Sequence, residues 1–143
     1  FGAGTFLPVK VDNVLSHKMH QEWCTLNAQT SDIINNAILG NKRIISVGTT
    51  SLRVLETIAK KNKGKIIPWS GYTDLFVIPG FNFNVVDILI TNFHLPKSTL
   101  LMLVSAFHGH DRVFKSYKHA IKQKYRFFSY GDSCIFSKEN KKL

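Results

Sequence analysis

The sequence predicts an α/β domain of alternating strands and helices, built on a largely parallel sheet that is open or part of a barrel. Short apolar runs rich in β-branched residues, typical of buried strands, alternate with segments whose apolar residues recur at helical spacing. Such alternation is typical of strands joined by crossover helices. No linker, repeat or low-complexity tract divides the 143 residues. We therefore expect a single domain over residues 1–143.

The first half of the chain is expected to carry three extended segments and two helices. Ser31 can cap the first helix and Gly40 can end it. Lys60 and Lys61 suit the last turn of the second helix, because cations are favourable at the carboxyl end of the helix dipole. The expected elements are an extended segment over Thr5–Val14, strands over His20–Leu26 and Arg43–Val47, and helices over Ser31–Leu39 and Ser51–Lys61.

The second half repeats the pattern. The helix that begins at Ser98 is apolar nearly all round and should be buried, whereas the next one is amphipathic. On that second helix, the side chains expected to face the core are Val113, Phe114, Tyr117, Ala120 and Ile121. The expected elements are strands over Ile66–Trp69, Asp74–Ile78 and Val85–Thr91, helices over Ser98–Phe107 and Asp111–Lys124, and a strand or strand–turn–strand over Arg126–Phe136.

The chain is strongly basic. Nineteen Lys and Arg residues against nine Asp and Glu give a net charge of +10, which favours a nucleic-acid partner, although many basic proteins bind nothing anionic. No apolar run approaches the roughly 20 residues that a membrane span needs, so we expect no membrane partner. Two separated cysteines indicate reduced thiols in a cytoplasmic protein. The lysines cluster at Lys60, Lys61, Lys63 and Lys65, and again at Lys115, Lys118, Lys122 and Lys124.

The segment Val47–Arg53 has the form of an anion site. An apolar strand ends, Gly48 allows a turn, and three hydroxyl residues stand where a helix begins. Free backbone N–H groups at a helix N-terminus attract anions, and Arg53 could add charge. The carboxyl end of a strand is also where α/β proteins usually bind ligands. A simple polar helix cap explains the pattern equally well. The candidate binding residues are Thr49, Thr50, Ser51 and Arg53.

The segment Thr91–Thr99 shows the same order of strand, polar loop and helix start, and it carries more types of functional group. A buried strand runs into a polar loop, and Ser98 or Thr99 can cap the helix that follows. Asn92, His94 and Lys97 bring an amide, an imidazole and an ammonium group close together. The glycines of a nucleotide-binding phosphate loop are missing. We favour a functional site here over a structural loop.

Three further features carry weaker signals. If His17–Cys24 is a strand, His20, Glu22 and Cys24 share one face and His17 lies on the other, so a zinc site would need ligands from elsewhere. We therefore expect no metal, and a polar substrate-facing strand or ordinary histidines instead. Aromatics around Trp69 and over Phe127–Asp132 could stack on unpaired bases but are more often core residues. These observations alone do not identify a reaction.

At these motifs the sequence resembles the S-adenosylmethionine:tRNA ribosyltransferase-isomerases of queuosine biosynthesis. The matching segments occur in the family's order and cover nearly the whole chain, and the longest of them is very specific. They are Gly4–Val9, His17–Glu22, Val47–Ser51, Thr73–Asp74, Thr91–Phe107 and Tyr125–Asp132.

The resemblance implies an unusual reaction. The family uses S-adenosylmethionine as a ribosyl donor and transfers the ribosyl group to the aminomethyl group of a 7-deazaguanine at the tRNA wobble position. The ribose becomes an epoxycyclopentane, giving epoxyqueuosine, and adenine and methionine leave. A base must take a proton beside the sulfonium, and an acid must protonate adenine. Candidates at matching positions are His94, His17, His20, Glu22 and Asp74, with Thr49, Thr50, Ser51, Arg53, Asn92, Lys97, Ser98, Thr99, Tyr130 and Asp132 as substrate-binding residues.

Length is where the chain departs from the family. The family's members are much longer and look like an α/β barrel-like domain with a small β-barrel domain. We expect residues 1–143 to be the C-terminal part of the α/β domain, lacking the N-terminal half and the β-barrel domain. The chain would then work either as a fragment of a longer chain or with a separate N-terminal half. The alternative is a truncated, non-catalytic remnant that binds tRNA.

Overall fold

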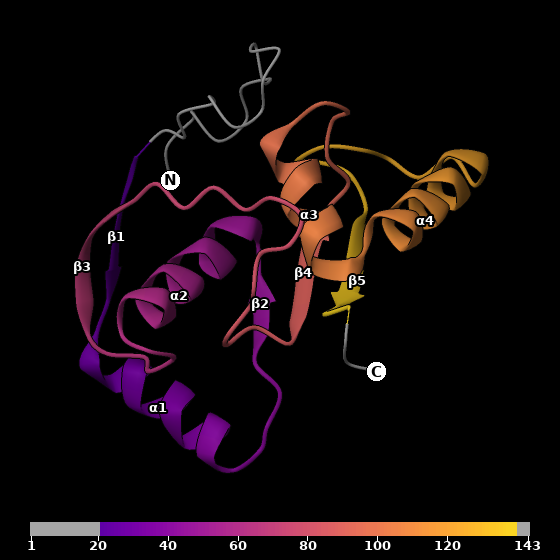
Figure 1. The fold of residues 1–143 in the computed structure, drawn as a ribbon. Helices are drawn as coiled ribbons and strands as arrows, with labels where there is room; N and C mark the ends of the chain where they lie inside the picture. The colour runs from indigo at the N-terminus through magenta and orange to yellow at the C-terminus, as the bar shows by residue number, and fades with distance from the viewer. Residues whose placement is uncertain (1–20, 140–143) are drawn as a thin grey trace.

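Helix α2 (Thr49–Lys61) lies between two small sheets and contacts both of them (Figure 1). The computed structural model describes residues 21–139, so the expected segment Thr5–Val14 and the candidates His17 and His20 lie outside the described residues. The other elements are β1 (Glu22–Leu26), α1 (Ala28–Leu39), β2 (Ile45–Val47), β3 (Trp69–Thr73), β4 (Ile88–Asn92), α3 (Thr99–His108), α4 (His110–Lys122) and β5 (Ser133–Ser137).

The mixed α/β class is confirmed, but the expected largely parallel sheet is wrong for residues 21–139. Strands β1 and β3 form one antiparallel pair. In the other sheet β4 lies between β2, which is parallel to it, and β5, which is antiparallel. The reason is the number of helices after β4. Helices α3 and α4 together carry the chain back to the edge at which β4 ended, so β5 must run in the opposite direction (Figure 1). Neither sheet closes into a barrel in this part of the chain.

Strand β3 replaces two strands expected on either side of it. Residues 66–68 and 74–78 form no regular strand. The residues between them pair with β1, and this pairing sets Trp23 against Tyr72 with ring centroids 5.0 Å apart. Cross-strand aromatic contacts of this kind stabilise antiparallel pairs. Similarly, Arg126–Asp132 is a loop, and only its continuation, β5, is a strand.

The helix caps predicted from the local sequence agree with the structure better than the predicted strands do, with one exception. Ser98 caps α3 by accepting a hydrogen bond from the Leu101 N–H, at 3.1 Å. Helix α1 instead begins three residues earlier than expected and is capped by Asn27, while Ser31 is buried and donates to the Ile66 carbonyl at 2.8 Å. Ser31, the predicted cap, therefore makes a long-range hydrogen bond instead, and the local sequence gives no sign of that partner.

One face of the β2–β4–β5 sheet is covered by helices, and the other is open. Leu89 and Phe136 are buried on the covered face. Ser46 of β2 is buried on the same face. The residues that follow or precede these three along their strands point the opposite way, and among them Val47 is 68% exposed and Ile135 is 63% exposed. Register places both beside Ile90 of β4. The open face therefore carries a row of apolar side chains across three strands.

The apolar stripe predicted for α2 agrees with the structure, whereas the one predicted for α4 agrees only in part. The stripe on α2 is confirmed, since Leu52, Leu55, Ile58 and Ala59 are all buried. On α4 the stripe is narrower than predicted, because this helix packs mainly against a single neighbour, α3. Val113, Tyr117 and Ala120 are buried, but Phe114 is 39% exposed and Ile121 is 65% exposed.

Three polar side chains on α2 each hold a different segment of the chain. Arg53, 1% exposed, contacts the Glu22 carboxylate at 3.3 Å and donates from Nε to the Leu75 carbonyl at 3.0 Å. Thr57 shares a hydrogen bond of 2.7 Å with Thr73. These three contacts hold β1, β3 and the segment after β3 against one helix.

Glu56 holds the segment that leads into β4. Its buried carboxylate accepts the backbone N–H groups of Asn84, Val85 and Val86 at 2.8, 3.0 and 2.9 Å. Hydrogen bonds to an ionised acceptor are stronger than neutral ones, and a buried N–H left without a partner costs free energy.

Replacing Glu56 with Gln should therefore destabilise the fold. The amide NH₂ of Gln can accept no hydrogen bond, so at least one of the three N–H groups loses its acceptor. We expect the free energy of unfolding, measured by urea denaturation, to fall by about 2–3 kcal/mol. Asp32→Asn on the exposed face of α1 removes the same charge and should change it by less than about 0.5 kcal/mol. Equal effects of the two substitutions would contradict the role given to Glu56.

Candidate functional site

The two polar loops singled out in the sequence lie at the same edge of one sheet. Strands β2 and β4 are parallel neighbours, so the loops that follow them leave the same carboxyl edge. The Gly48 N–H donates to the Ile90 carbonyl at 2.8 Å, which joins the start of one loop to the strand of the other. Gly48 has φ 86°, a conformation that favours glycine. The carboxyl edge of a parallel pair is the usual ligand position in α/β sheets.

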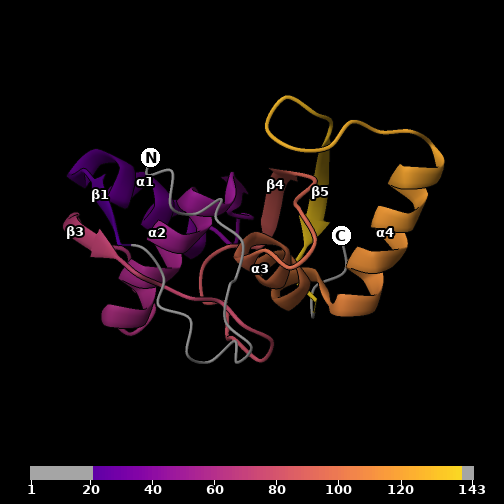
Figure 2. The same ribbon diagram turned by 90° about the horizontal axis from the view of Figure 1, so that it is seen from above.

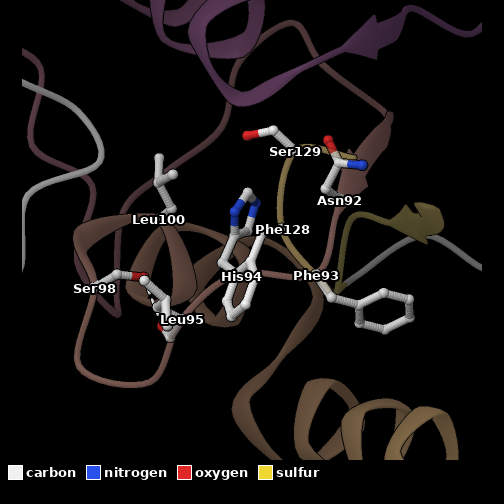
Figure 3. A pocket seen from close by; sticks show the side chains of 8 residues that line it. All are labelled: Asn92, Phe93, His94, Leu95, Ser98, Leu100, Phe128 and Ser129. Atoms are coloured by element: carbon white, nitrogen blue, oxygen red, sulfur yellow. Dashed lines mark hydrogen bonds between the residues drawn. The ribbon is translucent and has the colours of Figure 1, made fainter. Parts of the chain in front are cut away.

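A cavity of about 140 Å³ opens beside His94 at this edge. Figure 3 shows the imidazole standing between Leu100 on one side and Asn92 on the other, with Ser129 across the space and the ring of Phe93 turned away. The walls come from the loop after β4, the first turns of α3 and the loop before β5. The lining residues are Asn92, Phe93, His94, Leu95, Ser98, Leu100, Phe128 and Ser129.

His94 is held from two directions. Its Nε2 lies 3.0 Å from the Thr91 hydroxyl, and its backbone N–H donates to the Tyr117 hydroxyl at 2.9 Å. Burial lowers the pKa of the imidazole from 6.5 to about 4, because the charged form would lose its hydration. Burial also raises the pKa of Tyr117 to about 12. At neutral pH the cavity therefore presents an uncharged imidazole, and the Tyr117 phenol that binds the His94 backbone is un-ionised.

The loop before β5 forms the opposite wall and is tightly folded. The Asp132 carboxylate accepts the Arg126 backbone N–H at 2.7 Å, and this bond lowers the pKa of the carboxyl group. A side chain at Gly131 would place its Cβ 2.3 Å from the Arg126 carbonyl oxygen, so only glycine fits there. The Asn92 amide lies 3.4 Å from the Asp132 carbonyl, which links this wall to β4.

Backbone strain gathers around the same cavity. Phe128, one of its lining residues, has φ 69°, and Lys97 on the neighbouring loop has φ 58°. Non-glycine residues in this region are uncommon, and they occur often at functional sites. Lys97 itself is exposed, and Tyr130 is 97% exposed. Ser98 and Thr99 are buried at the start of α3, where the Ser98 hydroxyl also donates to the Leu95 carbonyl at 2.7 Å.

Other predicted residues lie at a second cavity, of about 410 Å³, formed by β1, α1 and α2. Thr50 and Ser51 line it from the first turn of α2, together with Glu22 and Cys24 from β1. Thr49 is buried. The structure thus separates Glu22 from the cavity that contains His94.

Arg53 and Asp74 occupy positions that the local pattern did not indicate. Instead of facing the surface at the helix start, Arg53 is buried against Glu22, and burial lowers its pKa while the Glu22 carboxylate opposes that change. Asp74 follows β3 and is exposed. Within residues 21–139, Arg53 Nη2 is a buried nitrogen without a hydrogen-bond partner.

Sequence reasoning missed two residues that hold His94. Thr91 was assigned only to a strand, although it lies three residues before His94, within reach of a chain that turns back. Tyr117 was assigned to the core, and nothing local shows that its hydroxyl meets the loop after β4. Both cysteines are free and half-buried, and burial raises the pKa of Cys134 to about 12.

Neither a metal-binding group nor a membrane-spanning helix occurs in the described part of the chain. No group of three or more His, Cys, Asp or Glu residues between residues 21 and 139 is placed to hold a metal ion. In the same range no helix is both long and apolar enough to cross a membrane.

Comparison with known proteins identifies a family and a similar solved structure. The family model described as "Queuosine biosynthesis protein" matches residues 1–136. A crystal structure of an S-adenosylmethionine tRNA ribosyltransferase from Thermotoga maritima is 46% identical in sequence, with a TM-score of 0.75. The match covers 79% of this chain and 39% of the Thermotoga chain, so this chain spans about two fifths of that relative.

The pKa of His94 predicts a specific dependence of stability on pH. The unfolded imidazole binds a proton near pH 6.5 and the folded one only near pH 4, so stability is complete above pH 6.5 and falls as the pH drops to 4. The loss should reach about 3 kcal/mol. The Gln side chain does not titrate, so in His94→Gln the free energy of unfolding, measured by urea denaturation, should lack this part of its fall between pH 6.5 and 4.

The exposed His110 supplies the control. His110→Gln should keep the steep decline of the original protein between pH 6.5 and 4. If His94→Gln and His110→Gln gave the same pH profile, the buried neutral state of His94 would be disproved.

Proposed function

The chain belongs to the queuosine biosynthesis protein family, and from this premise we propose that it carries part of the active site of a tRNA ribosyltransferase-isomerase. The reaction transfers the ribosyl group of S-adenosylmethionine to the aminomethyl-deazaguanine at the tRNA wobble position and isomerises it to give epoxyqueuosine. The printed name of the Thermotoga relative supports the donor and the tRNA acceptor. The proposed reaction needs no metal, and we propose the cytoplasm as the place where the protein works.

The observation that carries the proposal is the uncharged His94 in its cavity. S-adenosylmethionine is a sulfonium cation, and a protonated imidazole beside it would be repelled. A neutral imidazole can instead accept the proton from the carbon next to sulfur. A pKa of about 4 leaves almost no imidazolium at neutral pH to protonate the departing adenine. We therefore assign His94 the role of base or hydrogen-bond acceptor, and the acid is a different group.

The remaining polar groups at this edge are proposed to position the substrates. Asn92 lines the His94 cavity and offers its amide to the ligand, while Ser98, whose hydroxyl donates to Leu95 and accepts from Leu101, holds the cavity wall in place. Lys97, Tyr130 and Asp132 stand on the loops around it, where they can reach a larger substrate. Thr50 and Ser51, at the first turn of α2, are placed to hold a carboxylate or a ribose through the second cavity.

Two observations support the proposal that this chain forms the C-terminal part of a larger α/β domain. A cavity of about 140 Å³ is smaller than the roughly 300–1,000 Å³ typical of ligand sites, so it fits only the reacting part of the substrate. The open sheet face bearing Val47, Ile90 and Ile135 offers apolar surface for another layer. An N-terminal half, in the same or a separate polypeptide, would cover that face and complete the site, with the small β-barrel domain beyond it.

The small cavity also supports a second candidate, a non-catalytic remnant that binds tRNA through its charge of +10. A measurement of product formation distinguishes the enzyme from the non-catalytic remnant. The chain would be supplied with S-adenosylmethionine and tRNA bearing aminomethyl-deazaguanine, alone and together with an N-terminal half from the family. The enzyme proposal predicts epoxyqueuosine only in the combined sample. Product from the chain alone would contradict incompleteness, and no product in either sample would favour the remnant.

In the active combination, His94→Gln should lower kcat by about 100-fold or more, the usual contribution of a general base. Gln keeps a hydrogen-bonding group near the position of Nε2, so folding should survive. The matched control is His110→Gln, an exposed histidine outside both cavities, whose kcat should be unchanged. An unchanged kcat for His94→Gln would remove His94 from the reaction.

A further inference from the structure

Helix α4 has two chemically opposite faces. Val113, Tyr117 and Ala120 are buried against the rest of the fold. At 100° per residue, the basic side chains fall within an arc of about 120° on the other side of the helix. These exposed residues are Arg112, Lys115, Lys118, His119 and Lys122. Asp111, in the first turn, is the acidic residue of the helix.

The lysines of this basic face have no acidic neighbours that neutralise them. Within the described chain, no carboxylate lies within 4 Å of the ammonium groups of Lys115, Lys118 or Lys122. Asp111 is engaged with His110 at 3.2 Å, and Asp132 with Arg126 at 3.4 Å. A cluster of unpaired cations on a rigid helix is the form that protein surfaces take where they meet a phosphate backbone.

The basic face and the His94 cavity lie on either side of one buried residue, Phe93. A shallow hollow of about 430 Å³ is lined by Lys115 and His119 of α4, by Tyr125 and by Phe93. Phe93 also lines the His94 cavity. From α4 the chain crosses over the ends of β4 and β5 (Figure 2) and there exposes two aromatic rings, Phe128 at 52% and Tyr130 at 97%. The basic face of α4, the exposed rings of the loop after it and the His94 cavity therefore lie close together.

We propose that the basic face of α4 and the aromatic loop after it form the surface on which tRNA docks. The lysines contact phosphates of the anticodon stem, and Phe128 or Tyr130 stacks on an unpaired base of the anticodon loop, which brings the wobble base to the His94 cavity. This inference rests on the proposed function, because it takes tRNA as the substrate. It adds the place and orientation of binding.

A second lysine cluster provides a matched control. Lys60, Lys63 and Lys65 are exposed at the end of α2, on the far side of the molecule from α4 (Figure 1). Lys→Gln at these three positions removes the same charge as Lys→Gln at Lys115, Lys118 and Lys122. Both triple variants change only exposed side chains, so both should keep the unfolding midpoint of the original chain.

The test measures binding of an RNA anticodon stem-loop at several salt concentrations. The α4 triple variant should bind more weakly by about tenfold or more at 0.1 M salt and should show a shallower salt dependence, because three phosphate contacts are lost. The control triple should bind nearly as the original chain does. Tyr130→Ala should weaken stem-loop binding without changing the salt slope, since stacking releases no counterions.

The possible failures have different meanings. Equal weakening in both triple variants would show that net charge alone attracts RNA and would overturn the α4 surface while leaving the proposed function standing. Unchanged affinity in the α4 triple variant would also overturn the α4 surface and leave the proposed function standing. If the original chain bound no stem-loop at any salt concentration, the α4 surface would be overturned, and tRNA as the partner of this chain would be overturned with it.

Discussion

The rest of the structure depends on the buried polar face of α2. A helix between two sheets would ordinarily bury only apolar side chains, yet this one also buries Arg53, Glu56 and Thr57. Each binds a segment distant in sequence, namely β1, the entry to β4, and β3. Buried charges are tolerated only where hydrogen bonds or opposite charges compensate for lost hydration. These contacts therefore fix the positions of both sheets relative to one helix and disfavour other arrangements.

The candidate site is a consequence of that arrangement. Glu56 sets where the chain enters β4, and the parallel pairing with β2 places the loops after both strands at one edge. His94 follows β4 directly, so its position is inherited from the strand. Tyr117 then closes the site from α4, and the loop held by Asp132 supplies the opposite wall. The low pKa of His94 is thus a property of the assembled fold, because it is caused by burial of the imidazole.

The sequence predicted what short-range patterns decide and missed what distant contacts decide. The apolar stripe of α2 and the Ser98 cap follow from spacing within a few residues, and both were predicted correctly. The antiparallel β5 was not, because its direction depends on how α3 and α4 pack. Arg53 resembled a surface cation at a helix start, and its position is explained by two distant partners, the Glu22 carboxylate and the Leu75 carbonyl. The polar loop around His94 was recognisable from its composition, but its partners Thr91 and Tyr117 required the folded chain.

The central claim is that the His94 cavity receives the reacting part of S-adenosylmethionine, and NMR of the histidine rings tests it most directly. S-adenosylmethionine would be titrated into isotopically labelled protein while the signals of His94 and the exposed His110 are followed. We expect the His94 ring signals to shift and to reach saturation, while those of His110 do not move. Saturable shifts that leave His94 unchanged, or no shift of its ring at any concentration, would show that the ligand does not enter this cavity.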